Sequence, residues 1–293
     1  METKCGFVAL AGSPNVGKST LLNRLLGEEV AIVSPRPQTT WNVVRGILTR
    51  EEGQIIFVDT PGIHRARDYV GLHMVKQARQ AISEVDLLCW LVDCRQPPEE
   101  NWDLFVRPRP AAPSFLLINK IDLFDRPALL PRIEEYSKLG LFREIIPLSA
   151  LTGENVDRLS HLFWQYLPPS PLLFPPDQIS DQPERDLVRE FIREKVFQLT
   201  RQEIPYASAV KIDEFKERED GEKIYIAATI YVERKTQKGI LIGDKGAMIK
   251  KIGTAARRRI EGLLGRPVYL DLQVKIREGW RRDKTSLKEF GLD

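Results

Sequence analysis

The strongest constraint on the fold is a glycine-rich stretch near the start of the sequence. GSPNVGKS (12–19) fits the pattern G-x-x-x-x-G-K-[ST], follows the apolar run FVALAG (7–12) and precedes the helical pattern LLNRLLG. In such a loop, backbone N–H groups at the start of a helix surround nucleotide phosphates, the lysine reaches the β- and γ-phosphates, and the hydroxyl binds Mg²⁺. The sequence therefore predicts a nucleoside triphosphate site rather than a glycine-rich turn without a ligand. The predicted phosphate-binding residues are Gly12, Ser13, Pro14, Asn15, Val16, Gly17, Lys18, Ser19 and Thr20.

The composition is that of an ordinary globular protein. Of the 293 residues, 42% are hydrophobic and 29% are charged, which excludes a disordered chain, a collagen and a coiled-coil rod. Cys5, Cys89 and Cys94 form no C-x-x-C pair, so we expect a reducing compartment and no structural zinc. The N-terminus has no signal-peptide pattern and no apolar run approaches ~18 residues. We therefore expect a soluble cytoplasmic protein that is at most peripheral to a membrane.

A cluster of prolines marks a predicted domain boundary. The cluster consists of Pro168, Pro169, Pro171, Pro175 and Pro176. Proline neither continues a helix nor donates to a strand ladder, so we predict a domain at 1–168, a semi-rigid linker at 169–183 and a second domain at 184–293. Residues 1–180 carry 19 basic and 21 acidic residues (net −2), whereas residues 181–293 carry 25 and 20 (net +5). The second half is therefore expected to face an anionic partner.

Short apolar runs alternate with helical patterns in the first domain. The runs cover 7–12, 43–49, 55–60, 86–93, 114–120 and 144–150. Such runs, bounded by turns and separated by helices, are typical of a parallel sheet with helices on both faces. Only a polar turn around Glu51 to Gln54 joins the second run to the third, so this pair is predicted to be antiparallel. We predict an α/β P-loop domain.

The pattern changes in the second domain. A helix at about 184–202 precedes two strands joined by the charged turn EDGE (219–222), then two short helices around GDKG (243–246), a last strand and a basic tail. The three predicted strands cover 207–217, 223–234 and 267–276. We therefore predict an α+β domain with the order α-β-β-α-α-β.

Two further motifs are expected beside the phosphates. DTPG (59–62) ends the third apolar run, where a carboxylate can meet Mg²⁺ through water and a glycine N–H can approach the γ-phosphate. The polar stretch 35–41 could close over the metal through the hydroxyl of Thr39 or Thr40, of which we favour Thr40. The predicted GTP-binding residues therefore also include Asp59, Thr60, Pro61 and Gly62. The predicted Mg²⁺ ligands are Ser19, Thr40 and Asp59, and the predicted catalytic residues are Lys18, Thr40, Asp59 and Gly62.

The next two strand ends indicate which base is bound. NKID (119–122) follows SFLLI, and an ionised Asp122 can accept hydrogen bonds from N1–H and the 2-amino group of guanine. Adenine has no donor at either place and would leave the carboxylate unpaired. At the following strand end, SAL (149–151) fits a backbone contact to guanine O6. The predicted base-site residues are Asn119, Lys120, Asp122, Ser149, Ala150 and Leu151.

These motifs, in this order, resemble the small Ras-like P-loop GTPases and especially their translation-factor-related group. Ile63 stands where Ras-like switches carry a glutamine that orients water, and an aliphatic side chain cannot do so. Some members with a hydrophobic residue here use K⁺ held partly by a phosphate-loop asparagine, the position of Asn15. The resemblance implies Mg²⁺, K⁺ as a further ion, and slow GTP hydrolysis that K⁺ or a partner raises. His64 fits a solvated switch residue better than a catalytic base.

Nine basic residues and one acid, Asp244, lie between Arg234 and Arg259. At the centre, GDKG (243–246) resembles the GXXG loop of a type II KH module, in which two glycines let about four nucleotides of single-stranded RNA or DNA approach. The alternative is a glycine-linked helical pair with a solvated charged face. The predicted RNA-binding residues are Lys238, Ile242, Gly243, Asp244, Lys245, Gly246, Lys250, Lys251, Arg257 and Arg258.

Taken together, GSPNVGKS, PQTT, DTPG, NKID, SAL and GILIGDKG make the whole chain similar to the Era family of bacterial GTPases. The resemblance implies a ribosome-assembly factor that cycles between GTP and GDP and binds small-subunit ribosomal RNA near its 3′ end, on the 30S-type subunit. It also implies peripheral contact with the inner membrane, and we expect a monomer. Residues 107–113 depart from the family pattern, which has a longer helix before the strand leading to NKID.

Two other functions remain open at this point. The first is a signalling or membrane-associated GTPase whose basic domain binds acidic lipid or protein. The second is a nucleic-acid-binding protein in which GTP only stabilises the fold. Changes at GDKG and at Lys18, respectively, distinguish these alternatives from an RNA-binding switch.

Overall fold

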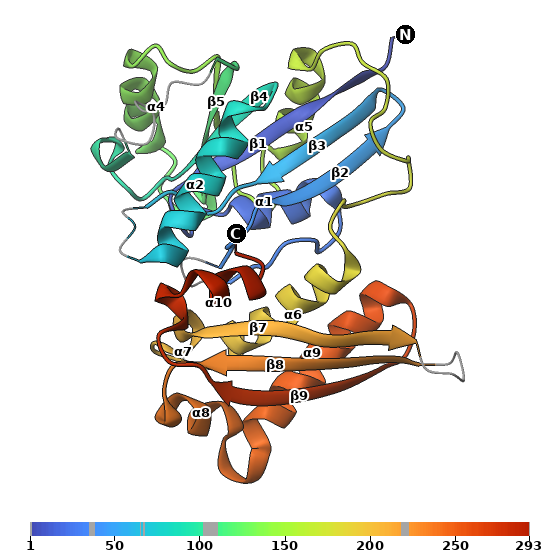
Figure 1. Cartoon of the computed structure of the whole chain (residues 1–293). Helices are drawn as coiled ribbons and strands as arrows, with labels where there is room; N and C mark the ends of the chain where they lie inside the picture. Colours follow the sequence, from blue (N-terminus) through green and yellow to red (C-terminus); the bar gives the residue numbers. More distant parts are fainter. Residues whose placement is uncertain are drawn as a thin grey trace. The chain divides into compact units, whose positions relative to one another are not determined.

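A computed structural model of the chain describes residues 2–34, 39–64, 66, 68–101, 111–217 and 223–292 (Figure 1). The chain forms two compact units. The first contains Met1–Ala66 and Gly71–Asp181, and the second contains Arg67–Val70 and Gln182–Asp293. The sequence boundary thus falls between 181 and 182, within the stretch predicted as a linker. The turn EDGE and most of the segment 107–113 lie outside the described residues.

A six-stranded sheet forms the centre of the first unit (Figure 1). Its strand order is β2-β3-β1-β4-β5-β6, and every pairing is parallel except that of β2 with β3. The predicted mostly parallel sheet with one antiparallel pair is therefore confirmed. The strands are β1 (Lys4–Gly12), β2 (Val44–Arg50), β3 (Gly53–Asp59), β4 (Leu87–Asp93), β5 (Ser114–Asn119) and β6 (Glu144–Pro147).

Both faces of this sheet are covered by apolar side chains. Along β1, Val8 and Leu10 belong to one buried cluster while Ala9 and Ala11 belong to another, since successive side chains of a strand point to opposite faces. The first cluster includes residues of α1 and α5, and the second includes residues of α2 and α4. The helices are α1 (Lys18–Leu26), α2 (Tyr69–Ser83), α4 (Leu129–Lys138) and α5 (Val156–Tyr166), with short 3₁₀ turns η1 (Pro98–Asn101) and η2 (Ile121–Leu123).

The proline-rich segment after α5 is packed along the first unit. Gln54, fully buried in β3, accepts hydrogen bonds from the backbone N–H of Leu173 (3.1 Å) and Phe174 (3.0 Å) through Oε1. Its Nε2 donates to the carbonyl of Phe174 at 3.0 Å. Farther along, the N–H of Ile47 in β2 donates to the carbonyl of Ile179 at 2.9 Å. Residues up to 181, most of the predicted semi-rigid linker among them, are therefore packed as part of the first unit.

The second unit has the predicted order α-β-β-α-α-β, with two differences. A short extra helix precedes the first strand, and the helix after GDKG has 18 residues instead of being short. Strand β8 pairs antiparallel with β7 and parallel with β9, giving the sheet order β7-β8-β9. The elements are α6 (Glu184–Leu199), α7 (Ile204–Ala207), β7 (Ser208–Glu217), β8 (Ile224–Val232), α8 (Lys235–Ile242), η3 (Asp244–Gly246), α9 (Ala247–Leu264), β9 (Val268–Ile276), η4 (Trp280–Arg282) and α10 (Lys284–Glu289).

One face of the three-stranded sheet forms the core of the second unit. Ile226 and Ile230 of β8 pack with Val196 of α6 and Ile252 of α9, all fully buried. On the opposite face, the ring of Phe290, just after α10, lies 5.1 Å from the ring of Tyr231. This second face is thus covered at one end by the C-terminal segment.

Candidate nucleotide site and basic loop

Backbone geometry shows why the phosphate loop needs its glycines. Gly12 has φ 147°, and a Cβ there would lie 2.3 Å from the carbonyl oxygen of Leu91. Gly17 has φ 102°, and a Cβ there would lie 2.2 Å from Nδ2 of Asn119. The loop also holds Asn15 at φ 64°, and α1 begins at Lys18. The strand, loop and helix expected for phosphate binding are therefore present.

Lys18 is held inside this loop. Its Nζ donates to the carbonyl oxygens of Gly12 (3.2 Å) and Ser13 (2.9 Å), and the residue is only 5% exposed. Burial lowers the pKa of Lys18 to about 8, an effect that the charge of Asp59 opposes. A phosphate oxygen of a bound nucleotide would therefore replace these two carbonyl oxygens, which are weaker acceptors, as the partner of the ammonium group.

Three of the predicted metal-binding residues meet at the start of α1. The hydroxyl of Ser19 donates to Oδ2 of Asp59 at 2.6 Å and lies 3.2 Å from the hydroxyl of Thr40. The second oxygen of Asp59, Oδ1, is buried without a hydrogen-bond partner. Burial raises the pKa of Asp59 to about 6, opposed by Lys18 and Ser19. Two hydroxyls and an unpaired carboxylate oxygen fit the hard-oxygen preference of Mg²⁺.

The described residues hold no cluster of three or more His, Cys, Asp or Glu side chains that could bind a metal. A divalent ion here would therefore depend on the two hydroxyls, on Asp59 and on oxygen atoms of the nucleotide. A cavity of about 50 Å³ lies beside this group. Its lining comes from the phosphate loop, residues 32–34, Thr39, Thr40 and Gly62. Thr39 and Thr40 thus both border the cavity, and Thr40 contacts Ser19. Pro37 and Gln38 of PQTT lie outside the described residues.

DTPG lies against the phosphate loop. A Cβ on Gly62 would come within 2.8 Å of the backbone N and Cα of Pro14, so only glycine fits without a shift of the loop. The N–H of Ile63 donates to the carbonyl of Gly12 at 3.1 Å, and the Thr60 hydroxyl donates to the carbonyl of Leu10 at 2.9 Å. The Ile63 side chain packs on the apolar cluster of the sheet. His64 is half-buried, with Nδ1 2.8 Å from the Gly62 carbonyl oxygen.

The base-site residues are linked by side-chain hydrogen bonds. Asn119 donates from Nδ2 to the carbonyl of Val16 at 2.7 Å and accepts the N–H of Ala150 through Oδ1 at 2.9 Å. The hydroxyl of Ser149 donates to Oδ1 of the exposed Asp122 at 2.5 Å. NKID is thereby tied to the phosphate loop on one side and to SAL on the other. Leu151 itself is 67% exposed.

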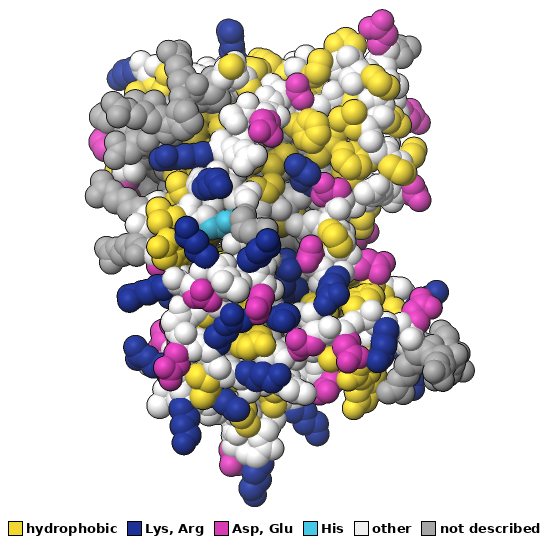
Figure 2. All heavy atoms as spheres, in the orientation of Figure 1, with side chains coloured by type: hydrophobic (Ala, Val, Ile, Leu, Met, Phe, Trp, Pro, Cys, Tyr) yellow, Lys and Arg dark blue, Asp and Glu magenta, His cyan; other side chains and the backbone are white. Residues whose placement is uncertain are grey.

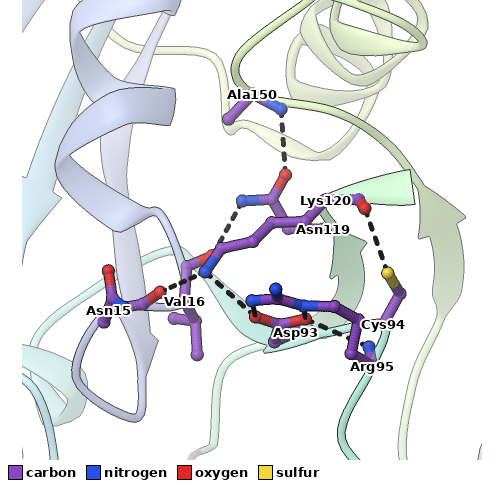
Figure 3. A network of polar contacts seen from close by, with 8 residues as sticks. All are labelled: Asn15, Val16, Asp93, Cys94, Arg95, Asn119, Lys120 and Ala150. Atoms are coloured by element: carbon purple, nitrogen blue, oxygen red, sulfur yellow. Dashed lines mark hydrogen bonds and ion pairs between the residues drawn. The ribbon is translucent and has the colours of Figure 1, made fainter. Parts of the chain in front are cut away.

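Asp93, which the sequence analysis did not single out, completes this arrangement (Figure 3). Its Oδ2 lies 2.9 Å from Nζ of Lys120, which also donates to the carbonyl of Asn15 at 2.6 Å. Arg95 contacts both oxygens of Asp93, at 2.9 and 2.6 Å. Burial opposes ionisation of Asp93, but the hydrogen bonds from Arg95 and Lys120 outweigh it and hold its pKa well below the usual range. The signal in the sequence was an acid at the end of an otherwise apolar strand.

In the second unit, GDKG forms a sharp loop between α8 and α9. Gly243, Lys245 and Gly246 have φ values of 71°, 48° and 82°. A Cβ on Gly243 would lie 2.8 Å from Met248, whereas a Cβ on Gly246 would meet nothing within 4 Å. Asp244 and Lys245 are exposed at the tip. The open backbone at Gly246 is what close approach of a sugar–phosphate chain needs.

The predicted RNA-binding residues outside the loop lie on α8 and α9. Lys250, Lys251, Arg257 and Arg258 are exposed, and Lys238 and Ile242 are half-buried. Arg259, by contrast, pairs at 2.5 Å with the buried Glu194 of α6 and supports the fold. Lys and Arg side chains gather on the second unit in Figure 2, including around the loop between α8 and α9.

A groove of about 290 Å³ runs between α9 and the edge strand β9. We call it the α9–β9 groove. It is lined by Ile249, Lys250, Gly253, Thr254, Arg257, Tyr269, Leu270 and Leu272. Three of its lining side chains are aliphatic and two are basic. Flat bases and a charged backbone would both find complementary surface here.

Comparison with known proteins gives family matches in both units of the chain. Residues 7–120 match the family described as 50S ribosome-binding GTPase, and residues 203–281 match the KH domain family. The chain is 53% identical to GTPase Era of Geobacter metallireducens over 98% of this chain and 97% of that protein. It is 50% identical to GTPase Era of Trichlorobacter lovleyi over 99% of this chain and 98% of that protein.

Two solved structures share the whole architecture. One is Aquifex aeolicus Era with a single substitution, bound to GDP and AlF₄⁻, with a TM-score of 0.93. The other is Era in complex with MgGDPNP and nucleotides 1506–1542 of 16S ribosomal RNA, with a TM-score of 0.94. Each is 43% identical and covers 99% of both chains. A nucleotide site built for guanine, a KH loop and these full-length matches lead to one conclusion: the chain is a GTPase that belongs to the Era family.

Proposed function

We propose that this protein is a GTP-hydrolysing, RNA-binding switch that acts in assembly of the small ribosomal subunit. The observation that carries the proposal is the presence, in one chain, of a guanine-nucleotide site and an open GXXG loop on a basic surface. A relative of the same architecture was crystallised with a 16S ribosomal RNA fragment. The expected RNA is therefore small-subunit ribosomal RNA near its 3′ end, on the 30S-type particle.

The phosphate loop would hold GTP or GDP with Mg²⁺ as cofactor. Ser19 and Thr40 would offer hydroxyls to the ion, and Asp59 would orient water around it. When bound, Mg²⁺ neutralises charge that develops on the phosphates during hydrolysis. Lys18 would add its positive charge between the β- and γ-phosphates, and the N–H of Gly62 would approach the γ-phosphate.

Intrinsic hydrolysis is expected to be slow because Ile63 cannot orient the attacking water by hydrogen bonding. The exposed Asn15 borders the nucleotide cavity and is the residue that would hold K⁺. We therefore propose that K⁺, or a partner on the ribosome, raises the rate.

In the second unit, RNA would bind with its backbone over GDKG and its bases in the α9–β9 groove. Lys238, Lys245, Lys250 and Arg257 would meet phosphates. Each phosphate neutralised on a single strand should contribute about −0.7 to the slope of log affinity against log salt. A flat salt dependence would argue against this surface.

We further propose that GTP with Mg²⁺ orders residues 35–41 and 59–70 and thereby changes RNA affinity, and that hydrolysis reverses the change. We place the protein in the cytoplasm as a monomer, with peripheral contact at the inner membrane. In the described part of the chain, every helix is too short or too polar to span a bilayer.

The direct test is sequencing of RNA crosslinked to the protein in growing cells, beside a Gly246→Asp variant. Gly265→Asp is the matched control, because it introduces the same charge at a glycine of similar φ with the same open space, at the far end of α9. We expect a sharp crosslink near the 3′ end of small-subunit ribosomal RNA that Gly246→Asp removes and Gly265→Asp keeps. A diffuse or absent signal would instead favour a basic domain that binds acidic lipid or protein.

A further inference from the structure

Three side chains form a continuous row across the outer face of the sheet in the second unit. Lys216 of β7 pairs in register with Tyr225 of β8, which pairs with Tyr269 of β9. The ammonium of Lys216 lies 5.3 Å from the centre of the Tyr225 ring. The rings of Tyr225 and Tyr269 stack with their centres 5.9 Å apart and their planes 13° apart. The row is thus a cation and two parallel rings in sequence.

The row ends at an open edge. Strand β9 is the last strand of the sheet on that side in the part of the chain that the structure describes (Figure 1). Tyr269 is 53% exposed although it is aromatic, and it also lines the α9–β9 groove. The C-terminal segment covers the other end of this face through Phe290 on Tyr231. Tyr225 stacks on the ring of Tyr269, and about half of the Tyr269 surface is exposed to solvent.

We propose that Tyr269 is a stacking site for one nucleobase of single-stranded RNA, beyond the nucleotides held at GDKG. Aromatic rings bind bases through their faces, and each base so stacked contributes binding free energy without a sequence requirement. The ammonium of Lys216 makes a cation–π contact with the face of the Tyr225 ring, and this contact orients the two stacked tyrosines. The subsite rests on the proposed RNA-binding function and extends it.

The position of Tyr269 at the border of the groove supports this assignment. Tyr269 lines the groove with Arg257, which lies eleven positions after Gly246 on α9. At about 1.5 Å per helical residue, that places this end of the groove roughly 16 Å from the GDKG loop. A GXXG loop holds about four nucleotides, so a strand that follows the groove would bring a later base to the ring. The charge along this path is positive, as an RNA backbone requires.

The cross-strand pair also stabilises the sheet, and the experiment must separate that role from binding. Tyr269→Phe keeps the aromatic face, Tyr269→Leu keeps only apolar bulk, and Gln273→Ala is a control on the same face of the same strand. The full-length proteins would be titrated with a labelled single-stranded RNA of the small-subunit 3′ end. A second series of this RNA would replace one base at a time by an abasic sugar.

Tyr269→Leu should weaken binding by about 5- to 150-fold, the range found for loss of one stacked base. Tyr269→Phe and Gln273→Ala should bind like the unsubstituted protein. One abasic position should cost the unsubstituted protein a similar factor and cost Tyr269→Leu nothing further. The salt slope should stay unchanged in Tyr269→Leu but fall in Lys250→Ala, since stacking neutralises no phosphate.

Equal affinity of Tyr269→Leu and the unsubstituted protein would overturn the subsite. So would an abasic penalty that persists unchanged in Tyr269→Leu, because the ring would then act only in the fold. If the unsubstituted protein failed to bind this RNA, or bound it equally with Gly246→Asp, the proposed RNA-binding function itself would fail. The two failures are therefore distinguishable.

Discussion

Replacement of Asp93 tests whether the network in Figure 3 sets the lifetime of bound nucleotide. The carboxylate lies 2.9 Å from Lys120, and its side chain is 9% exposed. Lys120 connects it to the phosphate loop through the carbonyl of Asn15. Asp93→Asn keeps the shape but removes the charge, so the loop that carries Asn119 and Lys120 loses its ionic link to β4.

The size of the effect follows from one charged hydrogen bond. Such a bond contributes ~1.5–3 kcal/mol, and asparagine can still accept a weaker neutral one. A loss near the lower end, ~1.4 kcal/mol, corresponds to a tenfold change in a rate or equilibrium constant. We therefore expect GDP to dissociate from Asp93→Asn about tenfold faster, measured by stopped-flow displacement of a fluorescent GDP analogue.

Arg95→Ala is the matched control. It removes the second partner of Asp93 and leaves the pair of Asp93 with Lys120 in place. The Arg95 side chain is 51% exposed. Because exposed pairs contribute little, its dissociation rate should change less than about threefold. The reasoning is refuted if Asp93→Asn releases GDP at the unsubstituted rate, or if both variants accelerate release equally.

The pH dependence has a definite sign. The folded-state pKa of Asp93 is lowered, so its stabilisation is present above the usual aspartate pKa of about 4 and is lost as pH falls below that value. The Asp93 contribution to GDP release should therefore be constant between about pH 5 and 8.

Three further predictions concern the nucleotide site. Asp122→Asn exchanges an acceptor for a donor, so GDP affinity should fall at least about 100-fold and xanthosine diphosphate should become the better ligand in a calorimetric comparison. Asn15→Ala should reduce hydrolysis in K⁺ buffer to the rate in Na⁺ buffer, while an unchanged K⁺ stimulation would exclude this residue as the ion's ligand. In nucleotide-free protein, the pKa of Asp59 is raised from 3.8 to about 6, so the free energy of unfolding should fall as pH rises across that interval, by on the order of 3 kcal/mol. Asp59→Asn should abolish that fall in chemical denaturation; persistence of the fall would contradict the shift.

Features governed by short-range chemistry could be predicted from the sequence. The strand–loop–helix of the phosphate site and the antiparallel pair β2–β3 follow from a motif and a short turn, and both are present. The GDKG loop between helices was predicted on the same basis. In each case the residues that decide the structure are close together in the chain.

Contacts that depend on strand register could not be predicted. Asp93 pairs in register with Asn119 on the neighbouring strand, so only the assembled sheet brings its carboxylate to Lys120. The row from Lys216 to Tyr269 similarly needs the register of three strands. For Asp93, the available signal in the sequence was an acidic residue at the end of an apolar strand, next to the strand that leads to NKID.

The proline-rich stretch shows a different limit. The prolines indicated a semi-rigid linker at 169–183, and the buried amide of Gln54 holds Leu173 and Phe174 of that segment against the sheet. A polar side chain in the middle of an apolar strand needs partners, and here the chain after α5 supplies them. The composition of the proline-rich stretch reports only its own stiffness, whereas its packing depends on Gln54 of β3.

The most direct test of a nucleotide-controlled RNA switch is the affinity of the full chain for the small-subunit 3′ RNA with a non-hydrolysable GTP analogue and with GDP. Coupling between two sites is typically 1–3 kcal/mol, so the two affinities should differ by about 5- to 150-fold. Lys18→Ala should abolish the difference, and Gly246→Asp should abolish binding in both states. Equal affinity with the GTP analogue and with GDP would contradict the switch.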